Sequence, residues 1–397
     1  MVHEGWKTTP LGAALDRVSR PVQVLPDQRY TQIGIRSHGR GLFIKDPVDG
    51  WELGDKRVFH VEANCLVLNI VFAWEQAVGK TDESHIGLIA SHRFPMYRPR
   101  KRACDIDFLR YYFLTPHGKH LLGLASPGGA GRNKTLGQKE FERLAIALPP
   151  LSEQKKVAEI LSTWDKAIET TEKLLVNAEA QKRALMQQLL TRHRRLKGFE
   201  GSQWQSVAVG RMGKVFGGGT PDSQVSEYWG GEIAWATPTD ITRLRQRFIR
   251  VTERTITKSG LKNSSANVLP PGSLLVCTRA TVGELAIAGV EIATNQGFKS
   301  IVPGRGYDVE FLYYLFEFHK REFVRYACGS TFLELSKRDF EKLSFSVPDE
   351  EEQRAIAGVL SNASSVVEGH KRRIETLRVE KRALMQQLLT GKRRVII

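Results

Sequence analysis

The sequence predicts an α+β chain in which two mixed α/β domains alternate with two long helices that pair antiparallel, all related by an internal pseudo-two-fold repeat. Three observations predict this fold class. The decapeptide KRALMQQLLT occurs twice, at 182–191 and at 381–390, an offset of 199 residues. Each copy closes a long stretch with helical periodicity, and each such stretch follows a region of short apolar runs separated by turn residues. Self-similarity at this long period indicates one duplicated module, and 397 residues are enough for both copies to form a core.

The first module begins with a globular region, residues 1–147. Short apolar runs at 65–72 and 86–89 are typical of strands, because turn residues bound them. A helix is predicted to begin near Phe108, and the Gly-rich basic stretch 126–134 is predicted to be a loop. This mixture of short strands and helices predicts an α/β domain.

The first long helix is predicted within residues 148–198. Pro149 and Pro150 end the preceding strand, and Ser152 is suited to cap the helix that follows. Apolar residues then keep a 4-3-4-3 spacing over more than four heptads, which indicates a coiled coil. The seam residues singled out in this helix are Leu161, Trp164, Ile168, Leu175, Leu185 and Leu189.

The second module repeats this order, with a globular region at 199–347 and a second long helix within 348–397. Strands are predicted at 273–277 and 285–288, and a helix at 311–316. Two helical stripes of equal length and register favour an internal antiparallel pair, and the alternative is that each helix binds a separate partner helix. The second seam includes Leu360, Val367, Ile374, Leu384 and Leu388.

The chain is strongly basic, with a formal net charge of +16 and a pI near 9.7. Nucleic acid is favoured over a membrane as the anionic partner, because no basic amphipathic helix or lipidation signal accompanies the charge. The sequence has no apolar run near the ~20 residues of a membrane helix and no signal-peptide pattern, so we expect a cytoplasmic protein. The four widely spaced cysteines predict buried core thiols and argue against disulfides or zinc.

The sequence contains no complete motif for catalysis or cofactor binding. Gly79-Lys-Thr81 has the ending of a P-loop, but Trp74 stands where the first glycine is required. The Gly217–Gly219 run does not continue as a dinucleotide-binding fingerprint, and the ten histidines contain no i, i+4 ligand pair. We therefore predict a chain that is non-catalytic by itself and that holds no metal and no cofactor.

Basic clusters interleaved with aromatic residues are the remaining signal. Loop Arg, Lys and Asn side chains contact phosphates and base edges of DNA, whereas a solvated charged face is the alternative for any single cluster. The stretch 93–102 carries five basic residues and no acidic one, which favours DNA. The candidate DNA-binding residues are Arg36, Arg40, Arg93, Arg98, Arg100, Lys101, Arg102, Arg132, Asn133, Lys134, Thr220, Arg243, Arg245, Arg247, Thr278, Arg279, Lys337 and Arg338.

Two basic globular regions, each followed by a near-identical coiled-coil helix, resemble the specificity subunit of type I restriction-modification systems. The resemblance is carried by 148–154 through 189–191 with their second copy, and by Gly218–Pro221, Tyr228, Trp229, Trp235 and Asp240. The first globular region lacks the Gly-Gly-Thr-Pro turn. The resemblance implies two target recognition domains that each read one half of a bipartite site in double-stranded DNA, with the paired helices as the spacer between the halves. Because the two globular regions differ in sequence, we expect the site to be asymmetric.

The resemblance also implies partner subunits. Two modification subunits would methylate adenine with S-adenosylmethionine, and two restriction subunits would use ATP and Mg. Met186 and Leu190, with their copies Met385 and Leu389, lie beside the seam, and we expect this face to dock the modification subunits. The alternatives are a coiled-coil scaffold that binds DNA without sequence preference and a polypeptide that is itself catalytic.

Overall fold

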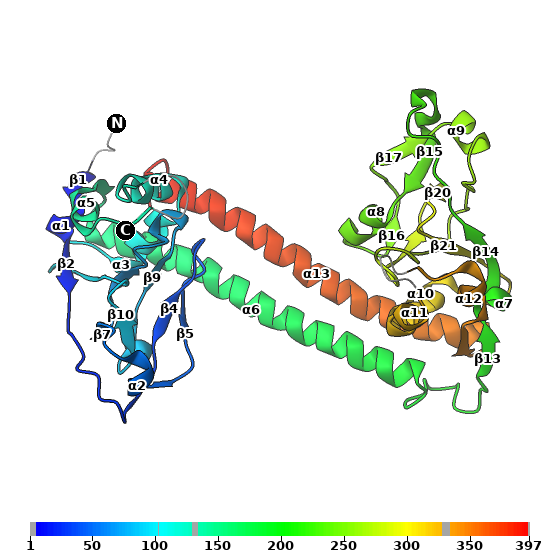
Figure 1. Cartoon of the computed structure of the whole chain (residues 1–397), viewed down its shortest axis with the longest axis horizontal. Helices are drawn as coiled ribbons and strands as arrows, with labels where there is room; N and C mark the ends of the chain where they lie inside the picture. Colours follow the sequence, from blue (N-terminus) through cyan, green and yellow to red (C-terminus); the bar gives the residue numbers. More distant parts are fainter. Residues whose placement is uncertain (1–4, 102, 129–133, 328–333, 396–397) are drawn as a thin grey trace. The chain divides into compact units, whose positions relative to one another are not determined.

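The computed structural model describes residues 5–101, 103–128, 134–327 and 334–395, and the chain forms two compact units (Figure 1). The first unit contains Met1–Thr170 and Ile374–Ile397, and the second contains Thr171–Arg373. Two long helices, α6 (Leu151–Leu190) and α13 (Glu350–Leu388), each contribute one half to each unit. Each unit is therefore a globular domain completed by the start of one long helix and the end of the other.

The first unit is built on a four-stranded antiparallel sheet with the strand order β2-β11-β8-β9. These strands are β2 (Leu15–Val18), β11 (Met96–Pro99), β8 (Leu66–Leu68) and β9 (Val78–Lys80). Smaller pairs join β1 (Lys7–Pro10) to β12 (Ala145–Leu148), β7 (Val58–His60) to β10 (Ile89–Ser91), β3 (Arg29–Tyr30) to β6 (Val48–Asp49), and β4 (Ile33–Ile35) to β5 (Leu42–Ile44). The helices are α1 (Leu11–Ala14), α2 (Gly50–Leu53), α3 (Ile106–Phe113), α4 (Pro116–Leu124) and α5 (Gln138–Arg143), with 3-10 turns η1 (Ala73–Glu75) and η2 (Glu83–His85).

The second unit repeats this sheet and extends it by one strand, in the order β14-β21-β18-β19-β16. These strands are β14 (Gly213–Gly217), β21 (Lys299–Pro303), β18 (Leu274–Val276), β19 (Leu285–Ala288) and β16 (Phe248–Ile249). A second sheet has the order β17 (Arg254–Ile256), β15 (Trp229–Ala236) and β20 (Ile292–Thr294), and β13 (Gln205–Ala208) pairs with β22 (Ser344–Val347). The helices are α7 (Val209–Met212), α8 (Pro238–Arg243), α9 (Lys258–Lys262), α10 (Val309–Phe318), α11 (Lys320–Tyr326) and α12 (Lys337–Lys342), with the 3-10 turn η4 (Ser226–Tyr228). The repeat thus extends into the domains, where the two sequences have diverged.

Most of the predicted elements are confirmed. The predicted strands at 65–72, 273–277 and 285–288 contain β8, β18 and β19, and the predicted helices are α3 and α10. The strand predicted at 86–89 is wrong except for Ile89, which begins β10. The chain forms η2 just before this segment, and Gly87 has a φ of +88°, so an extended strand cannot begin there.

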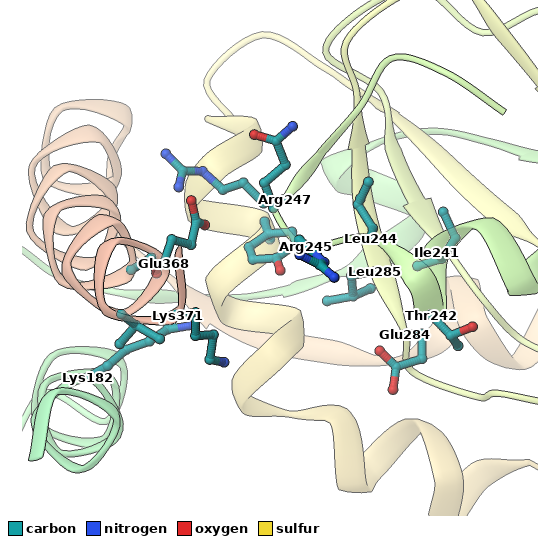
Figure 2. Close-up of a pocket in the computed structure, with 14 residues that line it drawn as sticks. Lys182, Ile241, Thr242, Leu244, Arg245, Arg247, Glu284, Leu285, Glu368 and Lys371 are labelled. Carbon is teal, nitrogen blue, oxygen red and sulfur yellow. The ribbon is translucent and has the colours of Figure 1, made fainter. Parts of the chain in front are cut away.

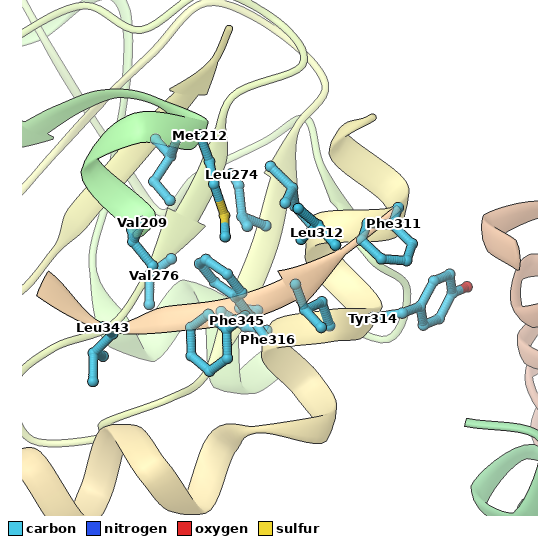
Figure 3. Packing of buried hydrophobic residues seen from close by; sticks show 14 of the residues in the cluster. Val209, Met212, Leu274, Val276, Phe311, Leu312, Tyr314, Phe316, Leu343 and Phe345 are labelled. Atoms are coloured by element: carbon cyan, nitrogen blue, oxygen red, sulfur yellow. The ribbon is translucent and has the colours of Figure 1, made fainter. Parts of the chain in front are cut away.

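Two equivalent aromatic helices, α3 and α10, form the centres of the two cores. In the first unit Trp6 packs edge-to-face on Phe108 of α3, with ring centroids 6.4 Å apart. In the second, Trp204 packs in the same way on Phe311 of α10 at 6.2 Å, within a core that also contains Phe316 (Figure 3). Edge-to-face pairs of this kind contribute beyond their buried area. Both domains are therefore organised around equivalent helices.

The two long helices pair antiparallel within each unit. In the first unit Leu161 of α6 shares a core with Leu388 of α13, and Asp165 of α6 accepts a hydrogen bond from Lys381 of α13. In the second unit a salt bridge of 2.9 Å joins Glu179 of α6 to Lys371 of α13, and Leu189 shares a core with Leu360. Advancing along α6 therefore moves backward along α13, which confirms the internal pair over separate partner helices. All eleven predicted seam residues are buried or half-buried.

The repeated decapeptide is explained by this pairing, because each copy packs on the domain of the other module. The Lys381 ammonium lies 5.1 Å from the ring centre of Tyr111 in the first unit, and Lys182 lies 5.5 Å from that of Tyr314 in the second. The equivalent helices α3 and α10 thus place equivalent tyrosine rings against the two copies of the decapeptide.

The predicted docking face must accordingly be corrected. Met186 and Leu190 are each 5 % exposed and Leu389 is 1 % exposed, and all three are core residues of their units. Met385 is half-buried against the core of the first unit. Three of these four side chains are therefore core residues that no partner subunit can contact, and the fourth packs against the core of its own unit.

A hydrogen-bonded carboxylate beside the decapeptide provides a test of this packing. Burial alone would raise the pKa of Asp165, but hydrogen bonds from Lys381 and Tyr111 outweigh it and hold the pKa below the usual 3.8. A depressed folded-state pKa contributes stability above the unfolded pKa, and that stability is lost as the pH falls through the folded value. Asp165→Asn is expected to destabilise the first unit at pH 7 by about 1 kcal/mol or less, because the carboxylate is 39 % exposed.

The measurement is the difference in thermal midpoint between variant and parent from pH 7 to pH 3. The difference for Asp165→Asn should shrink as the pH falls below 3.8. Ser364 occupies the equivalent position in α13 and accepts a hydrogen bond from Tyr314 without carrying a charge. Ser364→Ala is therefore the matched control, with an effect that should not depend on pH, and a constant effect of Asp165→Asn would contradict the electrostatic argument.

Candidate nucleic-acid interface

Three loops of the first unit meet at one end of its main sheet, and we call this meeting point the three-loop junction. It consists of the β8–β9 connection (69–77), the β10–β11 turn (92–95) and the segment before α5 (134–137). The Ile70 N–H donates to the Arg93 carbonyl at 3.0 Å, and the Leu136 N–H donates to the Ile70 carbonyl at 2.8 Å. Two backbone hydrogen bonds thus join three segments that are distant in sequence.

The second unit contains the same junction, formed by the β18–β19 connection, the β20–β21 turn and the segment before α12. The Thr278 N–H donates to the Gly297 carbonyl at 2.8 Å, and the Leu335 N–H donates to the Thr278 carbonyl at 2.9 Å. Each bond has its counterpart in the first unit. The junction is therefore part of the duplicated frame.

The turn that enters β11 or β21 has the same conformation in both units. The side chain of Ser91 accepts a hydrogen bond from the N–H two residues later, and so does that of Asn295. The residues that follow them, His92 and Gln296, therefore occupy equivalent positions, and both are exposed. Sequence reasoning missed both, because neither belongs to a basic cluster and only the fold relates them.

Predicted basic residues gather at the first junction. The His38 and Gly39 N–H groups donate to the carbonyls of Glu75 and Gln76, which brings the loop of Arg36 and Arg40 to η1. The Lys134 ammonium lies 5.7 Å from the ring centre of Trp74 in η1, and the Arg36 guanidinium lies 4.5 Å from that of Phe43. Together with exposed Arg93, these residues form a basic surface that contains aromatic rings, a composition suited to nucleic acid.

The second junction is also basic. Glu334 lies 3.8 Å from the Lys299 ammonium and 4.0 Å from the Arg279 guanidinium. Burial lowers the pKa of Lys299, and the nearby positive charges of Lys337 and Arg279 add to this effect against the attraction of Glu334. Two cations thus flank one carboxylate, Lys337 is near Lys299 and forms an ion pair of 3.6 Å with Glu341, and Arg338 is exposed in the same segment. The excess positive charge suits contact with phosphates.

The basic residues of the stretch 93–102 do not lie together on one surface. The middle of this stretch is β11, whose Met96 and Tyr97 are core residues, so Arg93 and Arg100 lie at opposite ends of the strand, on the order of 20 Å apart. Arg100 forms a 2.9 Å ion pair with Asp16 of β2. Arg98 and Lys101 are exposed near that second end, and Arg102, Arg132 and Asn133 lie outside the described residues.

Two further predictions are corrected in the second unit. Thr278 is fully buried, and its hydroxyl donates to the Gly297 carbonyl, so it supports the junction from inside. Arg247 forms a 3.0 Å ion pair with Glu310 and is 16 % exposed, so it is engaged within the protein. Its carbonyl accepts a hydrogen bond from the Ile287 N–H of β19 at 2.8 Å.

The other arginines of this cluster, Arg243 and Arg245, have different surroundings from each other. Arg245 lines a cavity of about 230 Å³ with Lys182, Glu368 and Lys371 (Figure 2). Arg243 forms an ion pair of 2.8 Å with Glu253 in which both side chains are about two-thirds exposed. The cluster 243–247 is thus divided among an exposed ion pair, a cavity wall and the contact of Arg247 with Glu310.

Two exposed side chains of the second unit were missed by sequence reasoning. Arg254 lies over Trp229, with its guanidinium carbon 3.4 Å from the ring centre, and 5.6 Å from that of Trp235. Gln296 accepts a hydrogen bond from Thr220, one of the predicted DNA-binding residues. Trp229 and Trp235 are close together in the sequence, but Arg254, which stacks on them, is 25 residues away from Trp229.

The described cysteines are core residues. Cys65, Cys104 and Cys277 are buried free thiols, as predicted, and burial raises the pKa of Cys65 to about 11, which keeps it protonated. Cys328 lies outside the described residues. Among the residues that the structure describes, no group of three His, Cys, Asp or Glu side chains is placed to hold a metal ion, and no helix there is long and apolar enough to cross a membrane.

A duplicated chain with two basic loop junctions on equivalent frames has the architecture of a sequence-recognition protein. A family model described as the type I restriction modification DNA specificity domain matches residues 67–180 and 201–378. These segments cover more than half of the chain, one in each repeat. The chain therefore belongs to the family of type I restriction-modification specificity domains.

Individual relatives agree with this assignment. The type I restriction enzyme MjaIX specificity subunit of Methanocaldococcus jannaschii is 39 % identical over 176 residues, which is 44 % of this chain and 41 % of that relative. A putative MjaX specificity subunit of the same organism is 25 % identical over 79 % of this chain and 76 % of its own length. The crystal structure of a type I restriction-modification S subunit from M. genitalium has the same fold, with a TM-score of 0.63 at 12 % identity over 98 % of this chain and 97 % of that one.

Proposed function

We propose that this chain is the sequence-recognition subunit of a type I restriction-modification complex and that each domain reads one half of a bipartite, asymmetric DNA site. One observation carries the proposal. Equivalent three-loop junctions, joined by matching backbone hydrogen bonds, present different exposed side chains in the two units. A common frame with different reading groups is what two unlike half-sites require.

The charge of the chain supports DNA as the ligand. The excess of positive charge supplies attraction to phosphates that is independent of sequence. Arg, Lys and Gln at the junctions supply the donors and acceptors that discriminate base edges. Both components of specific binding are therefore present at the same surface.

Chemistry belongs to the partners in this proposal. Two modification subunits with S-adenosylmethionine methylate adenine, and two restriction subunits with ATP and Mg complete the enzyme, as the family resemblance implies. Since Met186, Leu190 and Leu389 are buried, we assign partner docking to exposed positions of the long helices, among them Leu174, Val176 and Val366. Apolar side chains form the buried centre of many protein–protein interfaces, and these three are the candidates for it in this proposal.

The test is a reconstitution of the chain with its modification subunit, followed by mapping of methylated adenines on genomic DNA. We expect one bipartite motif, at least about 1000-fold preferred over other sequences. The modification subunit without the chain is the control and should give no motif. Binding that falls with salt but shows no sequence preference, with the modification subunit present, would instead favour a non-specific scaffold.

A further inference from the structure

We propose that Gln296 is the residue with which the second domain recognises an adenine in its half of the DNA site. This inference rests on the proposed function and makes it specific to one side chain. A glutamine amide pairs with adenine through two hydrogen bonds, because its nitrogen donates to N7 and its oxygen accepts from the N6 amino group. Gln296 is exposed at the second three-loop junction, so such an edge can reach it.

The backbone beneath Gln296 is held from several directions. The Asn295 N–H donates to the Ala236 carbonyl at 3.0 Å, and the Gly219 N–H donates to the Thr294 carbonyl at 2.9 Å. A Cβ on Gly218 would lie 1.9 Å from the Asn295 carbonyl oxygen, so the chain at 217–219 packs directly on the turn. The amide is therefore presented by a preorganised loop, which lowers the cost of ordering it on DNA.

The side chain is oriented as well. The Thr220 hydroxyl donates to Oε1 of Gln296, which fixes the amide so that Nε2 is directed away from Thr220. The oxygen retains a second lone pair for the adenine amino group. Thr220 is in this sense a positioning residue.

The surroundings match a contact with DNA. Cβ of Arg279 lies 3.9 Å from the position that a Cβ on Gly297 would take, so the backbone of Arg279 lies next to the turn, and its guanidinium is 4.0 Å from Glu334. Lys299 and Lys337 belong to the same positive cluster. Phosphate contacts from these residues would set the register in which Gln296 meets a base edge.

The equivalent position of the first domain is His92. An imidazole has its two nitrogens on opposite sides of the ring and cannot form the side-by-side donor and acceptor pair of an amide. The two domains therefore read this position of their half-sites differently. This agrees with an asymmetric site and localises one source of the asymmetry.

The experiment compares methylation motifs of complexes that carry Gln296→Ala, Thr220→Val or Thr220→Ser in the full chain. Gln296→Ala is expected to relax one A·T position of one half-site by about 5- to 150-fold and to leave the other half-site unchanged. Thr220→Val should relax the same position by a smaller factor, because it removes the hydroxyl. Thr220→Ser keeps the hydroxyl and should keep the base preference of the parent. Gln246→Ala, which removes another exposed amide of the same unit, is the matched control and should leave the motif unchanged.

The outcomes separate the inference from the proposed function. A parent complex without any motif would overturn the proposed function itself. A parent complex with a bipartite motif that Gln296→Ala leaves intact, or whose second half-site contains no A·T pair, would overturn only the role of Gln296. Equal thermal midpoints of parent and variant show that any change arises from recognition.

Discussion

Replacing residues 1–147 with residues 200–346 of the same chain is expected to yield a complex that methylates a site containing the second half-site twice. The two segments are equivalent at the offset of 199 residues, and each ends in a strand that pairs with the start of its own domain. The graft keeps both long helices in place. Because each junction reads its own half-site, two identical junctions should read two identical half-sites.

The structure indicates that the grafted domain will pack on the long helices in the same way as the domain that it replaces. The aromatic helix α10 would replace α3, and its Tyr314 already accepts the same decapeptide that Tyr111 accepts in the first unit. Trp204 and Phe311 would replace the equivalent pair Trp6 and Phe108. The matched control is the reciprocal graft of 1–147 onto 200–346, which should give the first half-site twice.

Mapping of methylated adenines is the measurement for both grafts. The effect is expected to be complete, since a change of several base pairs at 1–3 kcal/mol each is sufficient to abolish the original motif. A motif in which both halves differ from either parental half-site would contradict the prediction that each domain reads its own half-site independently of the other. Unchanged half-sites would show that specificity lies outside the grafted residues.

The frame of this protein could be predicted from sequence because its parts are local or repeated. The decapeptide, the heptad seam and the proline stops each require only neighbouring residues or an exact copy 199 positions away. The antiparallel pairing followed from the equal registers. What the decapeptide contacts could not be predicted, because its partners Tyr111 and Tyr314 belong to the opposite module.

The reading surface was much less accessible to sequence reasoning. The basic stretch 93–102 reads as one patch, yet a buried strand divides it, whereas Arg36 and Lys134 come together from far apart. Gln296 carries no charge and gives no signal in composition. Its environment is set by hydrogen bonds from segments near 219, 236 and 278, and only the fold brings these together.

The second large effect is expected where the linker between modules closes the second unit. Glu352 is 1 % exposed, and its carboxylate accepts hydrogen bonds from Arg195 at 3.0 and 2.9 Å, from Ser202 and from Trp204. Arg195 also donates to the carbonyls of Ser202 and Phe199, which fixes the linker on the domain. The first unit repeats this arrangement with Arg394 and Glu153 at the other end of the chain.

Arg195→Ala is therefore expected to destabilise the second unit by about 3–5 kcal/mol, because it leaves the Glu352 carboxylate buried without its cation. The double variant Arg195→Met with Glu352→Gln should recover much of this loss, since the charge is removed along with its partner while Ser202 and Trp204 still have an acceptor. Arg194→Ala changes the exposed neighbour and should stay within about 0.5 kcal/mol of the parent. Denaturant unfolding gives the free energies.

Hydrogen exchange distinguishes this explanation from general loss of stability. Arg195→Ala should increase exchange in β13, β22 and the start of α13, whereas Arg394→Ala should increase it in β1, β12 and the start of α6. Each variant thus loosens the unit whose buried glutamate has lost its arginine. Equal loosening of both units by either variant, or a double variant as unstable as Arg195→Ala, would show that the buried ion pair is not what holds the linker on the domain.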